Sequence, residues 1–365
     1  MKWRHGLVAA AILAAVPAAT ESLVDGRRSL VLEGEAARVV IDLLGGSIVR
    51  FEFKTSSLNP LVFGNSGSTS EARPMAHFLC LDRWGQPSEA EAKNGMPYHG
   101  EATRVEWKVL REPAPSAGGI AAELSASLPM AGLDVRRTIT LSAGGALFRV
   151  SEEVTNRNKL GRIYNMVQHP TIGPPFLDQS TIVDSNARKG FMQSSPLPNP
   201  EEPAVSWPQA LKDGRPVDMR ELRDDPLPNV VSYTIDEEYG WATASSPANG
   251  LLIGYIWPTR DYPWFNAWRD VRDGRPHARG LEFGTTGLHQ PFPVLVRKGQ
   301  IFGRPIYVHI DAGERQSRSY AAFLMNVPND YRGVEAITYA EGRITLQERS
   351  GGRPRSLTME VGNLW

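Results

Sequence analysis

The stretch that decides the fold is residues 38–54, which read RVVIDLLGGSIVRFEFK. Its first six residues are mostly apolar, and its last eight alternate between apolar and polar or charged side chains. Successive side chains of a β-strand point to opposite faces, so this alternation is typical of a strand with one buried face. Gly45 and Gly46 stand between the two halves, and glycine adopts the backbone angles of a tight turn without steric cost. The stretch therefore predicts a strand, a turn and a second strand.

Strand-like runs recur along the rest of the chain. Six of them are residues 103–109, 133–141, 147–155, 250–256, 292–296 and 306–310. The best candidate for a helix is residues 209–223, but Gly214 and Pro216 interrupt it. Many short strands with turn residues between them, and no alternation of strands with helices, favour an antiparallel sandwich or barrel. The predicted fold class is all-β.

Composition limits the classes of function. The chain has 365 residues, of which 41% are hydrophobic and 22% charged, as in a globular protein with a large core. Lys and Arg total 40, and so do Asp and Glu, so the formal net charge is zero. A neutral chain argues against nucleic acid or an acidic membrane as partner. Cys80 is the only cysteine, so neither an intramolecular disulfide nor a thiolate zinc site is expected.

The N-terminus has the features of an export signal. Lys2, Arg4 and His5 precede an uncharged apolar run at residues 6–16, and small residues follow it. The run falls well short of the roughly 20 residues that a helix needs to span a bilayer. We therefore expect residues 1–19 to be a cleavable signal peptide and residues 20–365 to form a single domain. The mature protein is expected in the periplasm or outside the cell, without a membrane anchor.

Side chains that could take part in catalysis or ligand binding cluster in a few short segments, which we call polar islands. These are residues 81–85, 95–101, 165–173, 262–270 and 280–287. Each island joins a charged or imidazole side chain to aromatic residues and turn glycines. Aromatic faces beside charged hydrogen-bonding groups suit sugars, whose C–H faces stack on rings while their hydroxyls take donors and acceptors. The islands indicate a small carbohydrate as ligand.

Taken in order, the islands resemble the aldose 1-epimerase (galactose mutarotase-like) superfamily, and in particular a divergent branch of it. The resemblance covers about the whole mature chain. The matching features are Gly45-Gly46 after an early strand, Arg83 before His99-Gly100, Trp107 in the next strand, His169 at the end of a central strand, Glu282 near a Gly/Thr-rich turn, and the segment from Ile310 to Tyr320. The resemblance implies a large antiparallel β-supersandwich and an isomerase that needs neither cofactor nor metal.

The resemblance also implies roles for individual residues. Mutarotation needs a base for the anomeric hydroxyl and an acid for the ring oxygen; Glu282 corresponds to the base and His169 to the acid. We expect these two side chains to face one cleft from opposite sides of a sugar-sized gap. Aromatic neighbours such as Trp264 and Trp268 are expected to desolvate the carboxylate and raise its pKa.

The substrate-binding residues follow less closely from the resemblance. Those expected to contact the sugar are Arg83, His99, Trp264, Trp268 and Asp270. The sequence departs from the family pattern after the histidine, where Pro170 and Thr171 replace an aromatic residue and an asparagine. Asp270 is only a loose match to the family's substrate-binding aspartate. These departures leave the identity of the sugar open.

Alternatives remain for the residues and for the function. Arg83 could pair with Asp82, Glu282 could be the solvent-facing residue of a strand, and both tryptophans could pack in the core. The same fold also serves as a non-catalytic carbohydrate-binding module. A third class is a metal-dependent lyase or hydrolase, although no His-x-His or His-Glu-x-x-His spacing supports it. Its candidate ligands are His77, His99, Glu101, His169 and Glu282.

Overall fold

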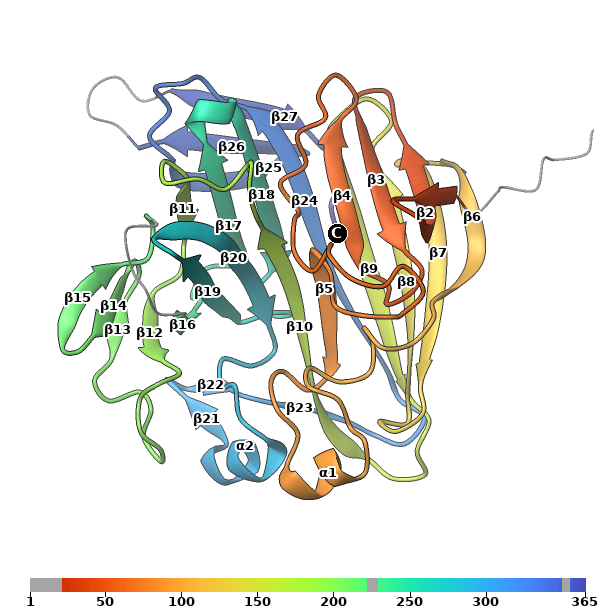
Figure 1. Ribbon diagram of the computed structural model, residues 1–365, viewed down its shortest axis with the longest axis vertical. Coiled ribbons are helices and arrows are strands. Elements are labelled where there is room, and N and C mark those ends of the chain that lie inside the picture. Colours follow the sequence, from red (N-terminus) through yellow and green to blue (C-terminus); the bar gives the residue numbers. More distant parts are fainter. Residues whose placement is uncertain (1–21, 222–228, 350–354) are drawn as a thin grey trace, which may run out of the picture.

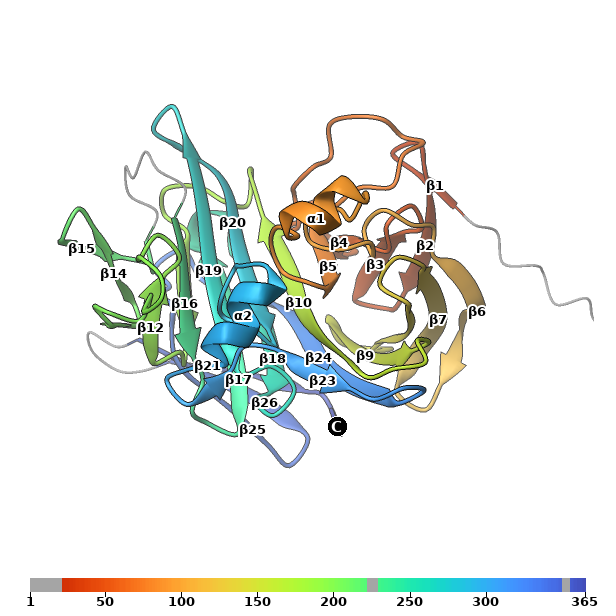
Figure 2. The same ribbon diagram turned by 90° about the horizontal axis from the view of Figure 1, so that it is seen from below.

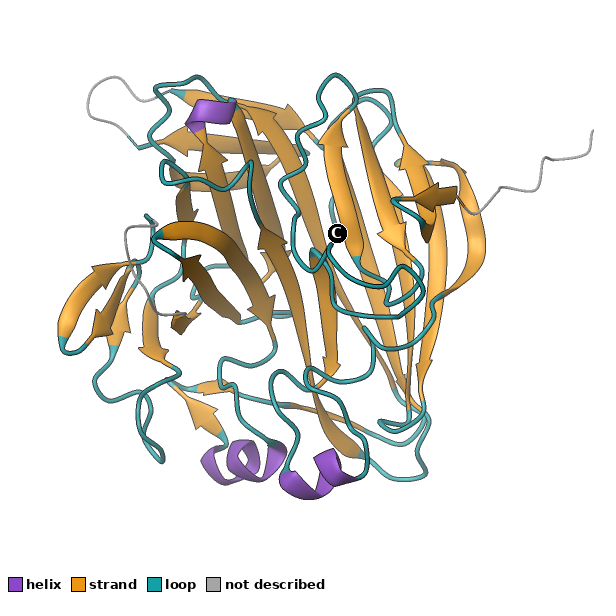
Figure 3. Ribbon diagram, viewed as in Figure 1, coloured by secondary structure: helices purple, strands orange, loops and turns teal. Residues whose placement is uncertain are grey.

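Two large β-sheets packed face to face dominate the computed structural model, which describes residues 22–221, 229–349 and 355–365 (Figure 1). Helices are few and short, as the colouring by secondary structure shows (Figure 3). Every strand pairing within the described residues is antiparallel. The all-β supersandwich predicted from the sequence is confirmed.

The larger sheet has 12 strands and carries most of the polar islands. Its strand order is β1 (Ser22–Val24), β2 (Arg27–Glu33), β3 (Ala37–Asp42), β4 (Ile48–Phe53), β5 (His77–Asp82), β10 (Arg162–Ile172), β20 (Arg275–Gly284), β19 (Trp264–Arg272), β16 (Asn229–Thr234), β12 (Lys189–Met192) and β13 (Val205–Ser206), with β23 (Val308–Ile310) paired to β10. Its central strand β10 therefore pairs with β5 on one side and with β20 on the other.

The second sheet has eight strands and closes the core. Its order is β11 (Ile182–Ser185), β17 (Tyr239–Ser246), β18 (Leu251–Pro258), β24 (Arg315–Asn326), β9 (Leu147–Asn156), β8 (Leu133–Leu141), β7 (Gly119–Leu128) and β6 (Lys108–Ser116). Aromatic rings join the two sheets: Phe51 meets Phe148 edge to face at 4.8 Å, and Phe283 stacks on Trp257 at 4.2 Å. The core thus lies between the sheets and leaves the other face of each to be covered or exposed.

Smaller elements cover the edges and outer faces. A three-stranded sheet, β25 (Val334–Ala340), β26 (Arg343–Glu348) and β27 (Ser356–Glu360), packs its apolar residues on the outer face of the second sheet. The remaining elements are the hairpins β14 (Gln209–Lys212)–β15 (Arg215–Asp218) and β21 (Gln300–Ile301)–β22 (Arg304–Pro305), the 3-10 turn η1 (Pro247–Asn249), and the helices α1 (Glu89–Lys93) and α2 (Phe292–Lys298). Both helices lie at one end of the molecule (Figures 1 and 2).

The stretch at residues 38–54 forms β3, a glycine turn and β4, as predicted. Gly45 and Gly46 have φ angles of 123° and 67°, which side chains rarely permit. A Cβ atom on Gly46 would also lie 2.3 Å from the ring of Trp107. The turn therefore needs glycine for its backbone angles and for its close contact with the core.

Three local predictions are wrong. The helix candidate at residues 209–223 is the hairpin β14–β15, because Asp213 and Gly214, with φ of 51° and 74°, form a two-residue turn that suits a hairpin; residues 222 and 223 lie outside the described part. Residues 292–296, expected as a strand, are in α2, where Pro293 occupies the first turn and loses no helical hydrogen bond. Residues 103–105 form turns and a bend, Glu106 makes only an isolated β-bridge with Leu44, and the strand begins at Lys108.

The predicted signal peptide lies outside the described residues. Within the described part, no helix is both long enough and apolar enough to cross a membrane.

Candidate functional site

A pocket of about 350 Å³ opens on the face of the larger sheet that points away from the second sheet. Strands β5, β10, β16, β19 and β20 form its floor, and the loops that follow β4, β5 and β20 form its walls. Its lining residues are Phe63, Pro74, Phe78, Trp84, Tyr98, His99, His169, Val230, Trp268, Glu282 and His289. We call it the His169–Glu282 pocket.

The side chains of His169 and Glu282 meet because of the register between β10 and β20. Gln168 of β10 pairs with Phe283 of β20, which places His169 directly opposite Glu282, with both side chains on the pocket face. His169 Nε2 lies 3.1 Å from Glu282 Oε1. The two residues share one pocket, as expected, but the prediction that they flank a sugar-sized gap is wrong. Opposed residues of adjacent strands are too close for a sugar to lie between them.

His169 is held on two sides. The ring of Phe78, its partner on β5, stacks on the imidazole at 4.1 Å. Its Nδ1 lies 3.0 Å from the hydroxyl of Thr171, which in turn lies 3.4 Å from the main-chain oxygen of His169. When that hydroxyl donates to the carbonyl, it accepts the proton of Nδ1. The unprotonated Nε2 then faces Glu282.

Glu282 is held by a tryptophan and given room by a glycine. Trp84 Nε1–H donates to Oε2 at 2.7 Å. Gly280 lies two residues earlier on the same face of β20, and a Cβ atom there would be 2.9 Å from Oε1. Glu282 is only 1% exposed. Its position is therefore set by one hydrogen bond, one imidazole contact and the absence of a neighbouring side chain.

Burial moves the pKa values of the pair in opposite directions. Desolvation raises the pKa of Glu282 well above its ordinary value, and the hydrogen bond from Trp84 opposes this. Desolvation also lowers the pKa of His169 from 6.5 to about 3. Although the two atoms are close enough for an ion pair, both shifts favour the uncharged forms. The two shifts thus favour the arrangement in which a proton shared by the pair lies on the carboxyl group, which agrees with an unprotonated Nε2.

The loops add three polar groups at one end of the pocket. His99, with φ of 67°, accepts a hydrogen bond at Nδ1 from the main-chain N–H of Gly85 at 3.0 Å, which leaves its proton on Nε2. The Tyr98 hydroxyl lies 3.0 Å from Nε2 of His289. Burial lowers the pKa of His99 well below its ordinary value and that of His289 to about 4. This end of the pocket is polar but uncharged at neutral pH.

The structure brings four of the seven predicted site residues together. His99, His169, Trp268 and Glu282 all line the pocket. The sequence reasoning did not select Trp84, Tyr98 or His289. Trp84 stands beside Arg83 in the first polar island, and Tyr98 stands beside His99. No sequence pattern pointed to His289, because it lies 191 residues from Tyr98 and only the fold brings the two together.

The other three predicted residues lie outside the pocket lining. Arg83 donates hydrogen bonds to Asp82 at 2.6 Å and to Glu91 at 3.0 Å, so its charge is compensated within the protein. Asp270 lies 2.8 Å from Arg272 and contacts His277. Trp264 is fully buried, and its Nε1–H donates to the main-chain oxygen of Pro305.

The candidate metal ligands do not converge. His77 points into the core, where Gln168, Tyr255 and Tyr320 surround it. Glu101 accepts hydrogen bonds from two main-chain N–H groups of the turn before β8. Among the residues that the structure describes, no three His, Cys, Asp or Glu side chains form a group able to hold a metal ion.

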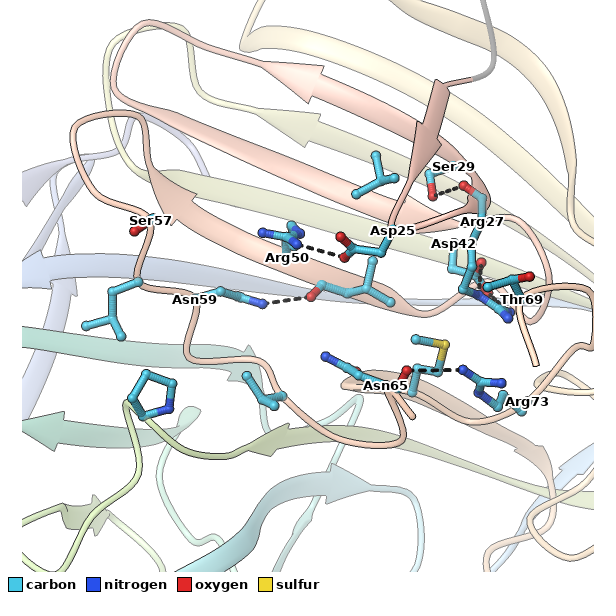
Figure 4. A pocket seen from close by; sticks show the side chains of 16 residues that line it. Asp25, Arg27, Ser29, Asp42, Arg50, Ser57, Asn59, Asn65, Thr69 and Arg73 are labelled. Carbon is cyan, nitrogen blue, oxygen red and sulfur yellow. Dashed lines mark hydrogen bonds and ion pairs between the residues drawn. The ribbon is translucent and has the colours of Figure 1, made fainter. Parts of the chain in front are cut away.

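A second hollow, of about 230 Å³, lies between strands β1–β4 and the segment 57–75 (Figure 4). We call it the crevice. Arg27 donates to both carboxylate oxygens of Asp42 at 2.9 Å and to the main-chain oxygens of Ser68 and Glu71. Burial nevertheless raises the pKa of Asp42, against the attraction of Arg27. The side-chain amide of Asn59 donates to the main-chain oxygens of Val49 in β4 and Leu61 in the loop, and it accepts from the main-chain N–H of Phe51. These polar groups fasten a loop to the sheet, so the crevice is the weaker candidate for a site.

No protein-family model and no curated protein matches the sequence. The structure, in contrast, is similar to solved galactose mutarotase-like proteins. One from Clostridium acetobutylicum superposes with a TM-score of 0.63 at 13% identity, over 84% of this chain and 98% of the other. One from Lactobacillus casei ATCC 334 gives 0.57 at 15% identity, over 81% and 100%.

A galactose mutarotase related enzyme from Lactobacillus acidophilus gives a TM-score of 0.58 at 14% identity, over 82% of this chain and 98% of the other. A TPR-domain containing protein from Parabacteroides distasonis matches 83% of this chain with only 48% of its own length, at 12% identity and a TM-score of 0.52. The chain therefore has the galactose mutarotase-like fold.

Proposed function

We propose that this protein is an aldose 1-epimerase-like isomerase, which interconverts the anomers of a free sugar. The observation that carries the proposal is the 3.1 Å contact between His169 Nε2 and Glu282 Oε1 in a pocket of sugar size. The fold of the solved mutarotase-like structures supports it. The aromatic and imidazole lining supports it as well, because such groups suit a neutral sugar.

The pair can act on both oxygens of the anomeric carbon at once. The hydroxyl oxygen and the ring oxygen share that carbon, so two groups spaced 3.1 Å apart can reach both from one side. Opposite sides of a gap are not required. The sugar would sit over the pair, with the aromatic side chains around it keeping water out.

The reaction needs one proton, which the pair already holds. That proton first passes from the Glu282 carboxyl group to His169 Nε2; the resulting carboxylate then takes the proton of the anomeric hydroxyl while His169 Nε2–H protonates the ring oxygen. The bond between the anomeric carbon and the ring oxygen breaks, and an open-chain aldehyde forms. Rotation about the adjacent C–C bond followed by the reverse proton transfers closes the ring to the other anomer and returns the pair to its starting form.

Polarimetry on a panel of freshly dissolved aldoses tests this proposal. The wild-type protein should accelerate the approach to anomeric equilibrium for at least one sugar. Glu282→Gln and His169→Asn should each lower kcat by about 10²- to 10⁴-fold, the usual contribution of a positioned base or acid. Glu335→Gln, which changes an exposed carboxylate of β25, is the control and should behave as wild type. Unchanged rates in the two pocket variants would contradict the mechanism.

The alternative is a carbohydrate-binding protein without catalysis. The match to about half of a longer TPR-domain containing protein favours it, because there the fold is one part of a larger chain. This alternative predicts that the wild-type protein binds a sugar by calorimetry but never exceeds the spontaneous rate of mutarotation.

We also propose that the protein is exported. The positive start, the short apolar run and the small residues before position 20 support this. Expression of the full chain with fractionation and mass measurement tests it. The expected product is a periplasmic or secreted protein that lacks about the first 19 residues.

A further inference from the structure

The His169–Glu282 pocket has a polar end and an apolar end, with His169 between them. The ring of His169 lies 5.7 Å from that of His99 and 5.9 Å from that of Trp268. At the polar end, Tyr98 and His289 adjoin His99. At the apolar end, Phe63 packs edge to face on Trp268 at 5.7 Å.

The apolar end is continuous. Val230 is the cross-strand partner of Trp268, so their side chains lie next to each other on the pocket face. Pro74 completes this end of the lining. The described lining residues here offer no charged group and no hydroxyl, and their only polar side-chain atom is the indole Nε1 of Trp268, which can donate one hydrogen bond. Arg83 is not part of the lining, and its guanidinium is bound by Asp82 and Glu91. A hydroxyl, carboxylate or phosphate placed at the apolar end would lose its water and could regain at most one hydrogen bond from these side chains.

The proposed mechanism orients a pyranose between these two ends. The ring oxygen must lie at His169, and the carbon next to it is C5. The substituent on C5 therefore lies beside the acid, while the hydroxyl on C2 lies on the other side of the anomeric carbon. With the C2 and C3 hydroxyls toward His99 and His289, which can bond them, the C5 substituent meets Phe63, Val230 and Trp268.

We infer that the pocket selects an uncharged aldose that carries hydrogen or a methyl group on C5, a pentose or a 6-deoxyhexose, over sugars with a hydroxymethyl, carboxylate or phosphate-bearing group there. This inference rests on the proposed function and adds the substrate class to it. The lowered pKa values of His99, His169 and His289 agree with it, because no imidazolium is present at neutral pH to hold an anionic sugar.

Matched sugar pairs test the inference. Polarimetry would compare D-fucose with D-galactose, L-rhamnose with L-mannose and D-xylose with D-glucose, and would include D-glucose 6-phosphate and D-galacturonate. In the pair that the enzyme accepts, kcat/KM should be about 10- to 100-fold higher for the sugar without the hydroxymethyl group, since a hydrophobic pocket rejects an added hydroxyl to that extent. The phosphate and the uronate should show no acceleration.

A pair of isosteric variants locates the effect. Val230→Thr places a hydroxyl at the apolar end and should reduce the preference several-fold, by improving the parent hexose. Val62→Thr makes the same change one residue before Phe63, at a side chain that lines the crevice instead, and should leave the preference unchanged.

The outcomes separate this inference from the proposed function. Acceleration with an equal or better rate for the parent hexose, or for the phosphate, overturns the inference while the proposed function stands. If no sugar is accelerated, the proposed function fails, and calorimetry on the same pairs decides the inference. Tighter binding of the pentose or 6-deoxyhexose supports the substrate class, whereas binding without preference, or no binding, overturns it.

Discussion

The His169–Glu282 pocket and the crevice lie on the same large sheet and share the segment 57–75, yet they use polar side chains differently. In the crevice, Arg27 and Asp42 neutralise each other, and Arg27 also bonds main-chain oxygens of the loop. In the pocket, Glu282 and His169 are buried and lie together, and desolvation shifts both pKa values toward the uncharged forms. A buried charged pair that also bonds the main chain stabilises the structure, whereas a buried acid and base in contact beside an open pocket are available for proton transfer. Changes in the crevice should therefore alter stability, and changes in the pocket should alter activity.

The largest expected effect on stability comes from the crevice. Asp42→Asn leaves the Arg27 charge buried without its partner and should lower the free energy of unfolding by about 3–5 kcal/mol. The kcat of the folded protein should change by less than a few-fold, because the main-chain oxygen of Phe63 is held separately by the N–H of Ala76. Urea unfolding and polarimetry measure the two effects.

A matched control lies in the same crevice. Asp25 pairs with Arg50 but is 69% exposed, so Asp25→Asn should cost no more than about 1 kcal/mol. Equal losses of unfolding free energy in the two variants would contradict the distinction between the buried Arg27–Asp42 pair and the exposed Arg50–Asp25 pair.

The pocket should make stability depend on pH. The folded pKa of His169, about 3, is below the 6.5 of the unfolded chain, so between these values only the unfolded chain binds the proton. The stabilising contribution of the neutral imidazole is complete above pH 6.5 and is lost as the pH falls toward 3. At pH 5 the loss is about 2 kcal/mol, at about 1.4 kcal/mol per pH unit.

Urea unfolding of the wild type and of His169→Asn at pH 7 and pH 5 measures this contribution. The wild type should lose about 2 kcal/mol more than the variant over that interval. Parallel losses would show that His169 titrates in the folded protein as it does in the unfolded chain.

Substitution of Gly280 tests, inside the pocket, whether activity depends on the position of the Glu282 carboxyl group. In Gly280→Ala, the new Cβ atom would lie 2.9 Å from Glu282 Oε1 and 3.3 Å from Trp268 Cβ, so the carboxyl group must move away from His169. We expect kcat to fall by about tenfold, because small misplacements of catalytic groups are costly, with little change in the midpoint of unfolding. Gly144→Ala is the control, since the nearest atom to its Cβ would be 4.0 Å away. Wild-type kcat in Gly280→Ala would contradict the placement of the carboxyl group.

The smallest effect is expected at the polar end of the pocket. Tyr98→Phe removes the hydroxyl that lies 3.0 Å from His289 Nε2. One such hydrogen bond contributes about 1 kcal/mol, so KM should rise a few-fold while kcat stays the same. Tyr339→Phe removes a hydroxyl that bonds Gly362 in the separate three-stranded sheet and should leave KM unchanged. A change in kcat alone would instead place Tyr98 in the chemistry.

Local patterns in the sequence predicted the strands well where alternation or a glycine turn was decisive, as at residues 38–54. The patterns failed where a short segment was compatible with two kinds of secondary structure. Residues 292–296 are apolar enough for a strand, and only the neighbouring prolines and Gly299 favour the helix that forms. At Asp213-Gly214 the turn pair outweighs the helix-like composition around it.

Residue type and order in the sequence were enough to select His99, His169, Trp268 and Glu282, which the structure places in one pocket. Their separation was not predictable, because the 3.1 Å contact depends on how β10 and β20 align. For Arg83, the sequence left two roles open, and the structure shows the pairing with Asp82 that was one of them. That choice depends on Glu91 of α1, which also reaches the guanidinium.

Strand β10 presents adjacent residues to opposite environments. Gln168 donates to Glu152 and Tyr262 in the core, while His169 faces the pocket. Because side chains alternate along a strand, the insertion or deletion of one residue in β10 would exchange the two environments. The imidazole would then enter the core, and an amide unable to act as an acid would enter the pocket. This strand should therefore accept no change in length in descendants of the protein, whereas the loops that form the pocket walls can change in length outside the residues that line the pocket.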